Sequence, residues 1–192
     1  MLRSARFQSG KRHTAGAFPR TLLLAGLALA GLPGGPAAGL PTAPPGCDVP
    51  AIDDFSYQSP DAVREAWPAM TGSAAASVAE LGGRRVLRLP CHFKGTTIER
   101  ASWDHPVRLD LVACRGIRFD VYCPDPTPIA QFSFYLHSGG GWYAGSFSII
   151  DRAGWNTVII DKTDTRIEDS PAGWGAIDRI RISAWRGRDN DT

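Results

Sequence analysis

Short runs of alternating apolar and polar residues, separated by Gly, Pro or Asp, fill the chain from Ile52 onward. Alternation with a period of two puts successive side chains on opposite faces of an extended strand, so it predicts β-strands. Only residues 59–66 have a helical pattern, because Ser59 can cap the first turn and Pro60 suits its first position. We therefore predict an all-β domain with at most one short helix. The expected strands are 52–57, 75–81, 85–93, 98–103, 107–111, 116–123, 129–138, 142–150, 155–162 and 179–185.

The best-defined pair of strands is the hairpin from residue 129 to residue 150, in which three consecutive glycines at 139–141 supply the turn. If His137 lies opposite Trp142, then Tyr135 shares their face of the sheet. Phe132 and Phe147 then lie opposite each other on the other face. The hairpin is thus expected to have one apolar face toward the core and one polar face with aromatic residues.

The polar faces of these strands are unusual in composition. A solvated β-face ordinarily carries Thr, Lys, Glu and Ser, whereas these faces carry Tyr, Trp, Arg, Asp and His. Flat aromatic rings and the forked donors of Arg suit the hydroxyl-rich rings of sugars. The predicted ligand-binding residues are Tyr135, His137, Trp142, Arg181 and Trp185. The alternative is that Arg118, Asp120 and Arg181 form cross-strand ion pairs covered by the aromatic rings.

The other tryptophans are expected to serve packing. Trp155 and Trp174 each follow a glycine and precede a strand, and we predict that both fill the core. Trp67 ends the helical segment and is also predicted to pack. Trp103 lies before Asp104 and is expected at a structured corner of the chain.

The first 39 residues differ from the rest of the chain. They hold five of the 21 Lys and Arg residues and no Asp or Glu, and they contain the apolar run 21–32 (TLLLAGLALAGL). This pattern, followed by the small residues Ala37 and Gly39, predicts a secretory signal peptide cleaved near Gly39. The run is shorter than the ~20 apolar residues needed to span a bilayer. We therefore expect a secreted or periplasmic protein without a membrane span.

Cleavage would leave one domain of nearly neutral charge. The formal net charge of +2 for the whole chain becomes 2 − 5 = −3 for the part after the leader. Nucleic acid and anionic membranes are therefore not expected as partners. The predicted organisation is a signal peptide at 1–39, a Pro-rich linker at 40–50 and one domain at 51–192.

The four cysteines are Cys47, Cys91, Cys114 and Cys123. An exported protein meets an oxidising compartment, and no C-x-x-C spacing indicates a metal site, so disulfides are expected. Cys114 and Cys123 lie at the two ends of one expected strand, too far apart for a bridge. We predict that Cys91 pairs with one of those two. A lipoprotein anchor at Cys47 is the alternative for that residue, although the preceding APPG lacks the usual aliphatic residue.

The sequence contains no motif for catalysis. The G-x-S-x-G elbow and the H-x-x-x-H zinc spacing are absent, and residues 161–165 lack the Gly and the closing Glu of a calcium loop. A self-contained hydrolase is therefore the least supported interpretation.

Six motifs stand out in residues 52–192: IDDF (52–55), RASWD (100–104), FDVYC (119–123), GWY (141–143), GWNTV (154–158) and PAGWGAIDRIRISAWR (171–186). Together they resemble galactose-binding-domain-like β-sandwich modules of secreted bacterial proteins, which are similar to carbohydrate-binding modules. The resemblance implies a non-catalytic jelly roll of two antiparallel sheets, often with a structural calcium ion away from the sugar site, and often next to a glycoside hydrolase or amidotransferase-like domain. In such modules a final strand follows the last motif and pairs beside the first strand. The sequence stops at Thr192, where that strand would begin, so the domain is expected to be truncated at its C-terminus.

Two functional hypotheses follow. The first is a non-catalytic carbohydrate-binding module that recognises a polysaccharide or glycan through its polar and aromatic face. The second is a structural or interaction domain whose aromatic face packs on an adjacent enzyme domain and which has no ligand of its own. In both, any catalytic activity belongs to a neighbouring domain.

Overall fold

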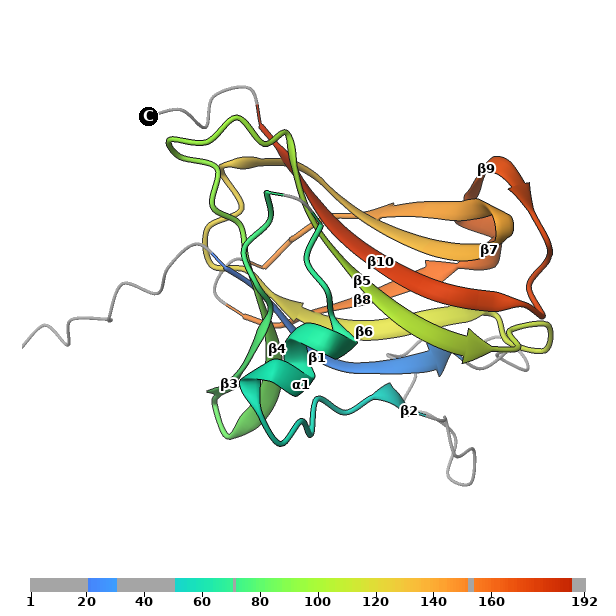
Figure 1. Cartoon of the computed structure of the whole chain (residues 1–192), viewed down its shortest axis with the longest axis horizontal. Helices are drawn as coiled ribbons and strands as arrows, with labels where there is room; N and C mark the ends of the chain where they lie inside the picture. Colours follow the sequence, from blue (N-terminus) through green and yellow to red (C-terminus); the bar gives the residue numbers. More distant parts are fainter. Residues whose placement is uncertain (1–20, 31–50, 71, 152–153, 188–192) are drawn as a thin grey trace, which may run out of the picture.

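A computed structural model of the 192-residue chain describes residues 21–30, 51–70, 72–151 and 154–187. The described residues form an all-β structure with one short α-helix, as the sequence predicts (Figure 1). The elements are β1 (Thr21–Ala30), β2 (Ala51–Asp53), α1 (Pro60–Ala66), β3 (Ser77–Leu81), β4 (Arg84–Pro90), β5 (Arg100–Leu109), β6 (Gly116–Tyr122), β7 (Ile129–Phe147), β8 (Asn156–Asp161), the 3-10 helix η1 (Lys162–Asp164), β9 (Arg166–Pro171) and β10 (Ile177–Arg186).

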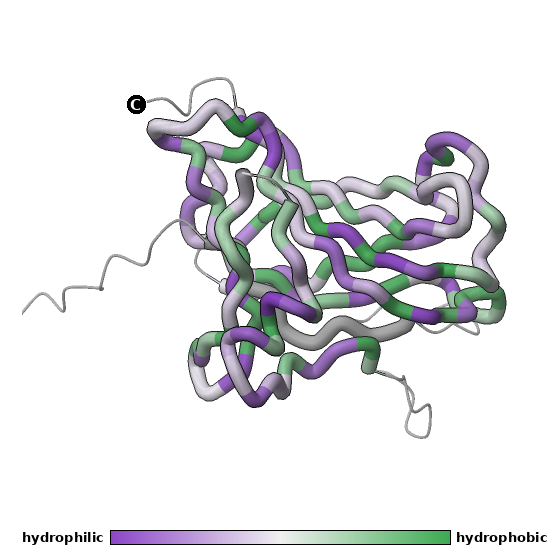
Figure 2. Tube along the Cα trace, viewed as in Figure 1, coloured by the Kyte–Doolittle hydropathy of each residue, from purple (hydrophilic) through white to green (hydrophobic). Residues whose placement is uncertain are grey.

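The described strands form two antiparallel sheets. Sheet A has the strand order β3-β4-β1-β6-β8, with β2 paired to β1, and sheet B has the order β5-β10-β7-β9. The sheets share one core, in which Phe119 of sheet A stacks on Phe134 of sheet B with ring centroids 5.3 Å apart. Hydropathy alternates along the strands of sheet B, as expected where one face is buried and the other is not (Figure 2).

The predicted helix is present as α1. Ser59 Oγ accepts a hydrogen bond from the backbone N–H of Ala62 at 3.1 Å, and Pro60 occupies the first turn. The helix ends at Trp67, whose backbone N–H still bonds to Val63 O. These are the capping contacts that the sequence predicts.

Strand β7 folds back on itself, as the glycine run predicts. The rings of Phe132 and Phe147 lie 5.2 Å apart, and those of His137 and Trp142 lie 4.5 Å apart. A straight strand would separate the two phenylalanines by about 50 Å at ~3.3 Å per residue, so the chain must reverse between them. Gly139 has a φ of 59° near this reversal. Both ring pairs agree with the predicted register.

Within the predicted domain, strands β5 and β9 differ from the prediction. The expected breaks at Asp104 and His105 do not occur, and β5 runs from Arg100 to Leu109 through Pro106. Strand β5 lies at the edge of sheet B, with a register irregularity opposite Pro106, and both conditions tolerate a proline. Strand β9 (RIEDSP) was not predicted, because its charges and its proline suit an edge strand rather than an alternating one.

Three of the four tryptophans that were expected to serve packing lie in or against the core, and the fourth does not. Trp67 and Trp103 are fully buried, so Trp103 is in the core on β5 rather than at a corner. Trp174 packs against the core with its ring 3.7 Å from that of Tyr143. The core prediction is wrong for Trp155, which lies on the outer side of sheet A beside Tyr122 and is only half-buried.

The apolar run of the predicted leader forms part of the sheet. Its residues Thr21–Ala30 are strand β1, paired on both sides. The rest of residues 1–39, the linker at 40–50 and Cys47 lie outside the described residues. Cleavage near Gly39 therefore stays a prediction. No helix within the described ranges has the length and apolar character required to span a bilayer.

The described cysteines lie near sheet A. Cys91 and Cys123 are buried and Cys114 is partly exposed, and the structure shows no bridge from Cys91 to Cys114 or Cys123. The Cys91 thiol lies 3.7 Å from Leu89 O, within hydrogen-bond reach. Oxidation of the exported protein stays a prediction.

Asp161 links the end of β8 to η1 and gives an acid-sensitive contact. Its side chain is ion-paired with Arg115 and accepts bonds from the backbone and hydroxyl of Thr163, and these contacts lower its pKa from 3.8 to about 2. The unfolded chain therefore binds the proton more readily than the folded chain. This stabilisation is complete above about pH 4 and is lost as the pH falls to about 2.

We expect Asp161→Asn to remove on the order of 1 kcal/mol of stability at neutral pH, because the exposed Arg115 partner is screened by solvent. The difference between variant and parent should shrink toward zero near pH 2. Urea unfolding at both pH values measures it. A difference that does not change with pH would contradict this account.

Candidate functional site

The outer face of sheet B brings four of the five predicted ligand-binding residues together. Arg181 on β10 pairs with Tyr135 on β7, and Arg179 two residues before it pairs with His137, so these side chains share one face. The Trp142 ring lies 4.4 Å from the Arg181 guanidinium, 4.5 Å from the His137 ring and 6.0 Å from the Tyr135 ring. We call Tyr135, His137, Trp142 and Arg181 the Trp142 cluster.

Trp185, the fifth predicted residue, lies on the same face but outside this cluster. It is four positions from Arg181 along β10, or about 13 Å at ~3.3 Å per residue. Its ring lies under the Arg100 guanidinium at 4.8 Å, and its indole N–H donates to Ser133 Oγ at 3.0 Å. Trp185 therefore belongs to a separate contact at the other end of the strand.

Asp104 fixes the position of Arg181. Its carboxylate oxygens accept bonds from Arg181 Nε at 2.6 Å and Nη2 at 2.9 Å, and Arg179 Nη1 lies 3.4 Å away. The Asp104 and Arg181 side chains are only 14% and 15% exposed. This two-pronged contact holds the guanidinium plane over Trp142. Arg181 thus makes a cross-strand ion pair, as the alternative interpretation expects, but its partner was not predicted.

Asp120, which that interpretation also names, lies on sheet A. It makes an ion pair with Arg84 of another strand at 2.8 Å, a partner that was not predicted. The Arg84 guanidinium in turn lies 4.6 Å from the Trp155 ring. Sheet A thus carries an arginine–tryptophan pair of its own, on the opposite side of the molecule's core.

Three buried serines separate the two ends of the sheet B face. Ser102, Ser133 and Ser183 align across β5, β10 and β7 and are at most 2% exposed. Ser102 Oγ and Ser183 Oγ are hydrogen-bonded at 2.8 Å. This row is closed to a ligand, so it divides the face into the Trp142 cluster and the Trp185 contact.

Asp178, near the start of β10, extends the Trp142 cluster beyond His137. Its carboxylate lies 2.6 Å from His137 Nδ1 and accepts a bond from Gly139 N at 3.4 Å. It also lines a shallow depression of about 340 Å³ together with Arg108 and Asp110. The carboxylates of Asp110 and Asp178 and the guanidinium of Arg108 therefore offer acceptors and donors in the depression next to the cluster. Asp178 was not predicted, because its distance from His137 in sequence gives no signal.

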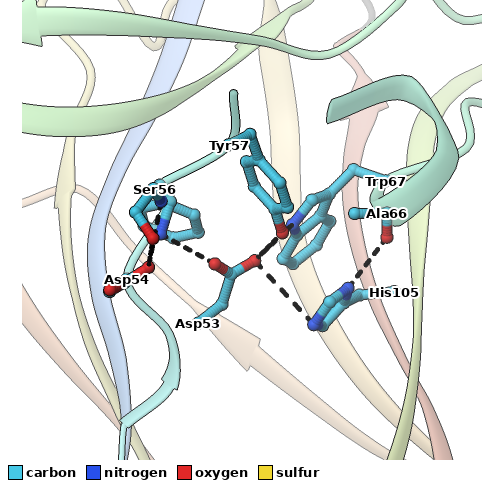
Figure 3. Close-up of polar contacts among 8 residues, drawn as sticks. Asp53, Asp54, Ser56, Tyr57, Ala66, Trp67 and His105 are labelled. Carbon is cyan, nitrogen blue, oxygen red and sulfur yellow. Dashed lines mark hydrogen bonds and ion pairs between the residues drawn. The ribbon is translucent and has the colours of Figure 1, made fainter. Parts of the chain in front are cut away.

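A second polar cluster surrounds Asp53 (Figure 3). The Asp53 carboxylate is 7% exposed and accepts bonds from the indole N–H of Trp67 at 2.8 Å, from Phe55 N at 2.7 Å and from the Tyr57 hydroxyl. His105 Nε2 lies 3.8 Å from it. The cluster joins β2, α1 and β5. The sequence showed Asp53 only as part of the IDDF motif.

The hydrogen bonds of this cluster indicate a structural role. His105 Nδ1 lies 2.8 Å from Ala66 O and must donate, since a carbonyl can only accept. The His105 ring stacks on Trp67 with centroids 4.5 Å apart. Burial and the bond to Asp53 raise the pKa of Tyr57 well above its usual 10, so the phenol stays protonated and serves as a donor. The polar groups of the cluster thus bond one another across three elements.

A calcium ion was a possible cofactor by resemblance. Within the described ranges, no group of three or more His, Cys, Asp or Glu side chains is arranged to hold a metal ion. We therefore assign no metal site.

Comparison of the chain with known protein families, with curated proteins and with solved structures finds no match.

Proposed function

We propose that the chain is a secreted or periplasmic, non-catalytic carbohydrate-binding module with a jelly-roll β-sandwich fold, and that it binds a polysaccharide or glycan at the Trp142 cluster. The observation that carries the proposal is the half-buried Trp142 ring, held by Arg181, His137 and Tyr135 on the outer face of sheet B. A ring fixed in this way loses little conformational entropy when it binds, which favours affinity.

The polar groups around the ring suit sugar hydroxyls. Asp104 engages two of the five N–H donors of the Arg181 guanidinium, so other donors are left for a ligand. Asp178 supplies carboxylate oxygens at the edge of the cluster. A sugar ring stacked near Trp142 would thus meet donors on one side and acceptors on the other.

A second candidate function is an interaction domain that packs on an adjacent enzyme domain. It is favoured by Ile167 on β9, which pairs with the buried Tyr143 of β7 yet is 63% exposed. The core-facing side of sheet B is therefore incompletely covered at its β9 edge. An adjacent domain could cover this edge, with the Trp142 cluster as further contact surface.

Trp142→Ala tests the binding proposal. We expect it to weaken glycan binding by ~1 to 3 kcal/mol, as the loss of a central aromatic contact does, with little change in melting temperature. Calorimetric titration of soluble polysaccharides into the parent and the variant measures the affinity. The matched control is Trp155→Ala, which removes a similarly half-buried ring beside an arginine on sheet A.

Three results bear on the choice between the two functions. Weaker binding for Trp142→Ala alone supports the carbohydrate module. Equal weakening for both variants would place the site elsewhere. If no polysaccharide gives a signal and both variants melt like the parent, the interaction domain is the better description.

A further inference from the structure

Strand β1 completes the middle of sheet A (Figure 1). It pairs antiparallel with β4, where Thr21–Leu24 lie opposite Pro90–Leu87, and with β6, where Leu23–Ala30 lie opposite Tyr122–Gly116. It also pairs with β2. The first part of the strand, Leu23 and Leu24, is bonded into the ladder on both sides.

The two neighbouring strands depend on this pairing. Without β1, β4 and β6 would be two strand spacings apart, about 9.5 Å, and could not bond each other. Sheet A would then divide into β3-β4 and β6-β8, with two open edges of unpaired N–H and C=O groups in its middle. Those edges carry Leu87, Leu89, Ile117 and Val121, which are all 0% exposed in the complete sheet.

We propose that the gap between β4 and β6 is a strand-acceptor site for an uncharged apolar segment of about ten residues, and that Thr21–Ala30 of this chain is its occupant. The ladder supplies affinity through main-chain bonds, as in other cases of strand addition. The register places Leu24 opposite both Leu87 and Val121, which are buried. The neighbouring acceptor positions Arg88, Tyr122 and Asp120 are polar, so apolar and polar acceptor positions alternate along the segment.

The proposal gives the predicted leader two competing uses. As the apolar run of a signal peptide, residues 21–30 must be available to the export machinery. As β1, the same residues are enclosed between two strands. Folding therefore withdraws the segment from export, whereas a chain that is cleaved near Gly39 before it folds leaves the acceptor site empty. A processed domain then needs another apolar strand in this site to keep sheet A intact.

The test uses the full chain with a protease recognition sequence inserted between Gly39 and Leu40, outside the described residues. The folded protein is cut there and passed over a size-exclusion column. We expect the fragment ending at Gly39 to stay bound at one copy per domain. The amide protons of Val121 and Leu87 should remain protected from exchange after the cut. A fragment that leaves while the domain keeps its melting temperature would overturn the proposal.

Leu24→Pro is the variant that removes the backbone bond at the doubly paired position. We expect it to release the fragment after cutting and to lower the melting temperature of the uncut chain. Ala38→Pro, outside the described residues, is the matched control and should do neither. A synthetic TLLLAGLALA peptide with flanking lysines should rebind the released domain and restore amide protection. Rebinding that is equally strong for a peptide carrying Leu24→Lys would contradict apolar selectivity.

Discussion

Replacing Trp67 with alanine is expected to lower the free energy of unfolding by roughly 3 to 5 kcal/mol. The indole is fully buried, stacks on His105 and donates its N–H to Asp53. Its removal opens a large cavity and leaves the buried carboxylate with one donor fewer, and both changes destabilise the folded state. Denaturant unfolding followed by circular dichroism measures the loss.

Tyr57→Phe separates the two contributions to this loss. It removes a donor to Asp53 but keeps the aromatic ring, so we expect about 1 kcal/mol. If Trp67→Ala costs no more than Tyr57→Phe, the ring contacts contribute little and the account of this cluster is wrong. A far larger effect of Trp67→Ala would show that packing around the ring is the main source of stability.

The strands were predictable wherever a single local pattern decides them. The glycines at 139–141 and the alternation on either side are enough to place the reversal in β7 and its two faces. Strand β9 was missed because an edge strand needs neither alternation nor freedom from proline. The place of Thr21–Ala30 as strand β1 was not predicted, because nothing local shows that β4 and β6 leave a gap of this width. The leader that these residues belong to by sequence stays a prediction.

The candidate site was predictable only where a local pattern within one strand decides which face a residue lies on. The hairpin register puts His137 and Trp142 on one face of β7, but parity along β10 alone does not place Arg181 beside them. That depends on the pairing of β10 with β7. The separation of Trp185 from the cluster depends on the alignment of β10 with β7, which comes from tertiary packing. Asp104 was seen only as a turn residue, and its contact with Arg181 requires β5 to lie beside β10.

The Asp104–Arg181 pair connects the stability of sheet B to its candidate site. We expect Asp104→Ala to lower the free energy of unfolding by about 2 to 3 kcal/mol, because it leaves the mostly buried Arg181 guanidinium without its two-pronged acceptor. The same change frees that guanidinium to move away from Trp142. Glycan affinity, if present, should therefore fall as well. Urea unfolding and titration of the same preparation give both quantities.

Arg181→Met provides the second side of a double-mutant cycle with Asp104→Ala. Since a buried pair replaced on both sides by uncharged groups leaves no unpaired charge, the double variant should recover part of the stability lost in Asp104→Ala. Glycan affinity should not recover, because Met has no donors for a sugar hydroxyl. Stability that returns while binding stays low would show that Asp104 acts by positioning Arg181. A double variant no more stable than Asp104→Ala would instead mean that the carboxylate stabilises sheet B through other contacts.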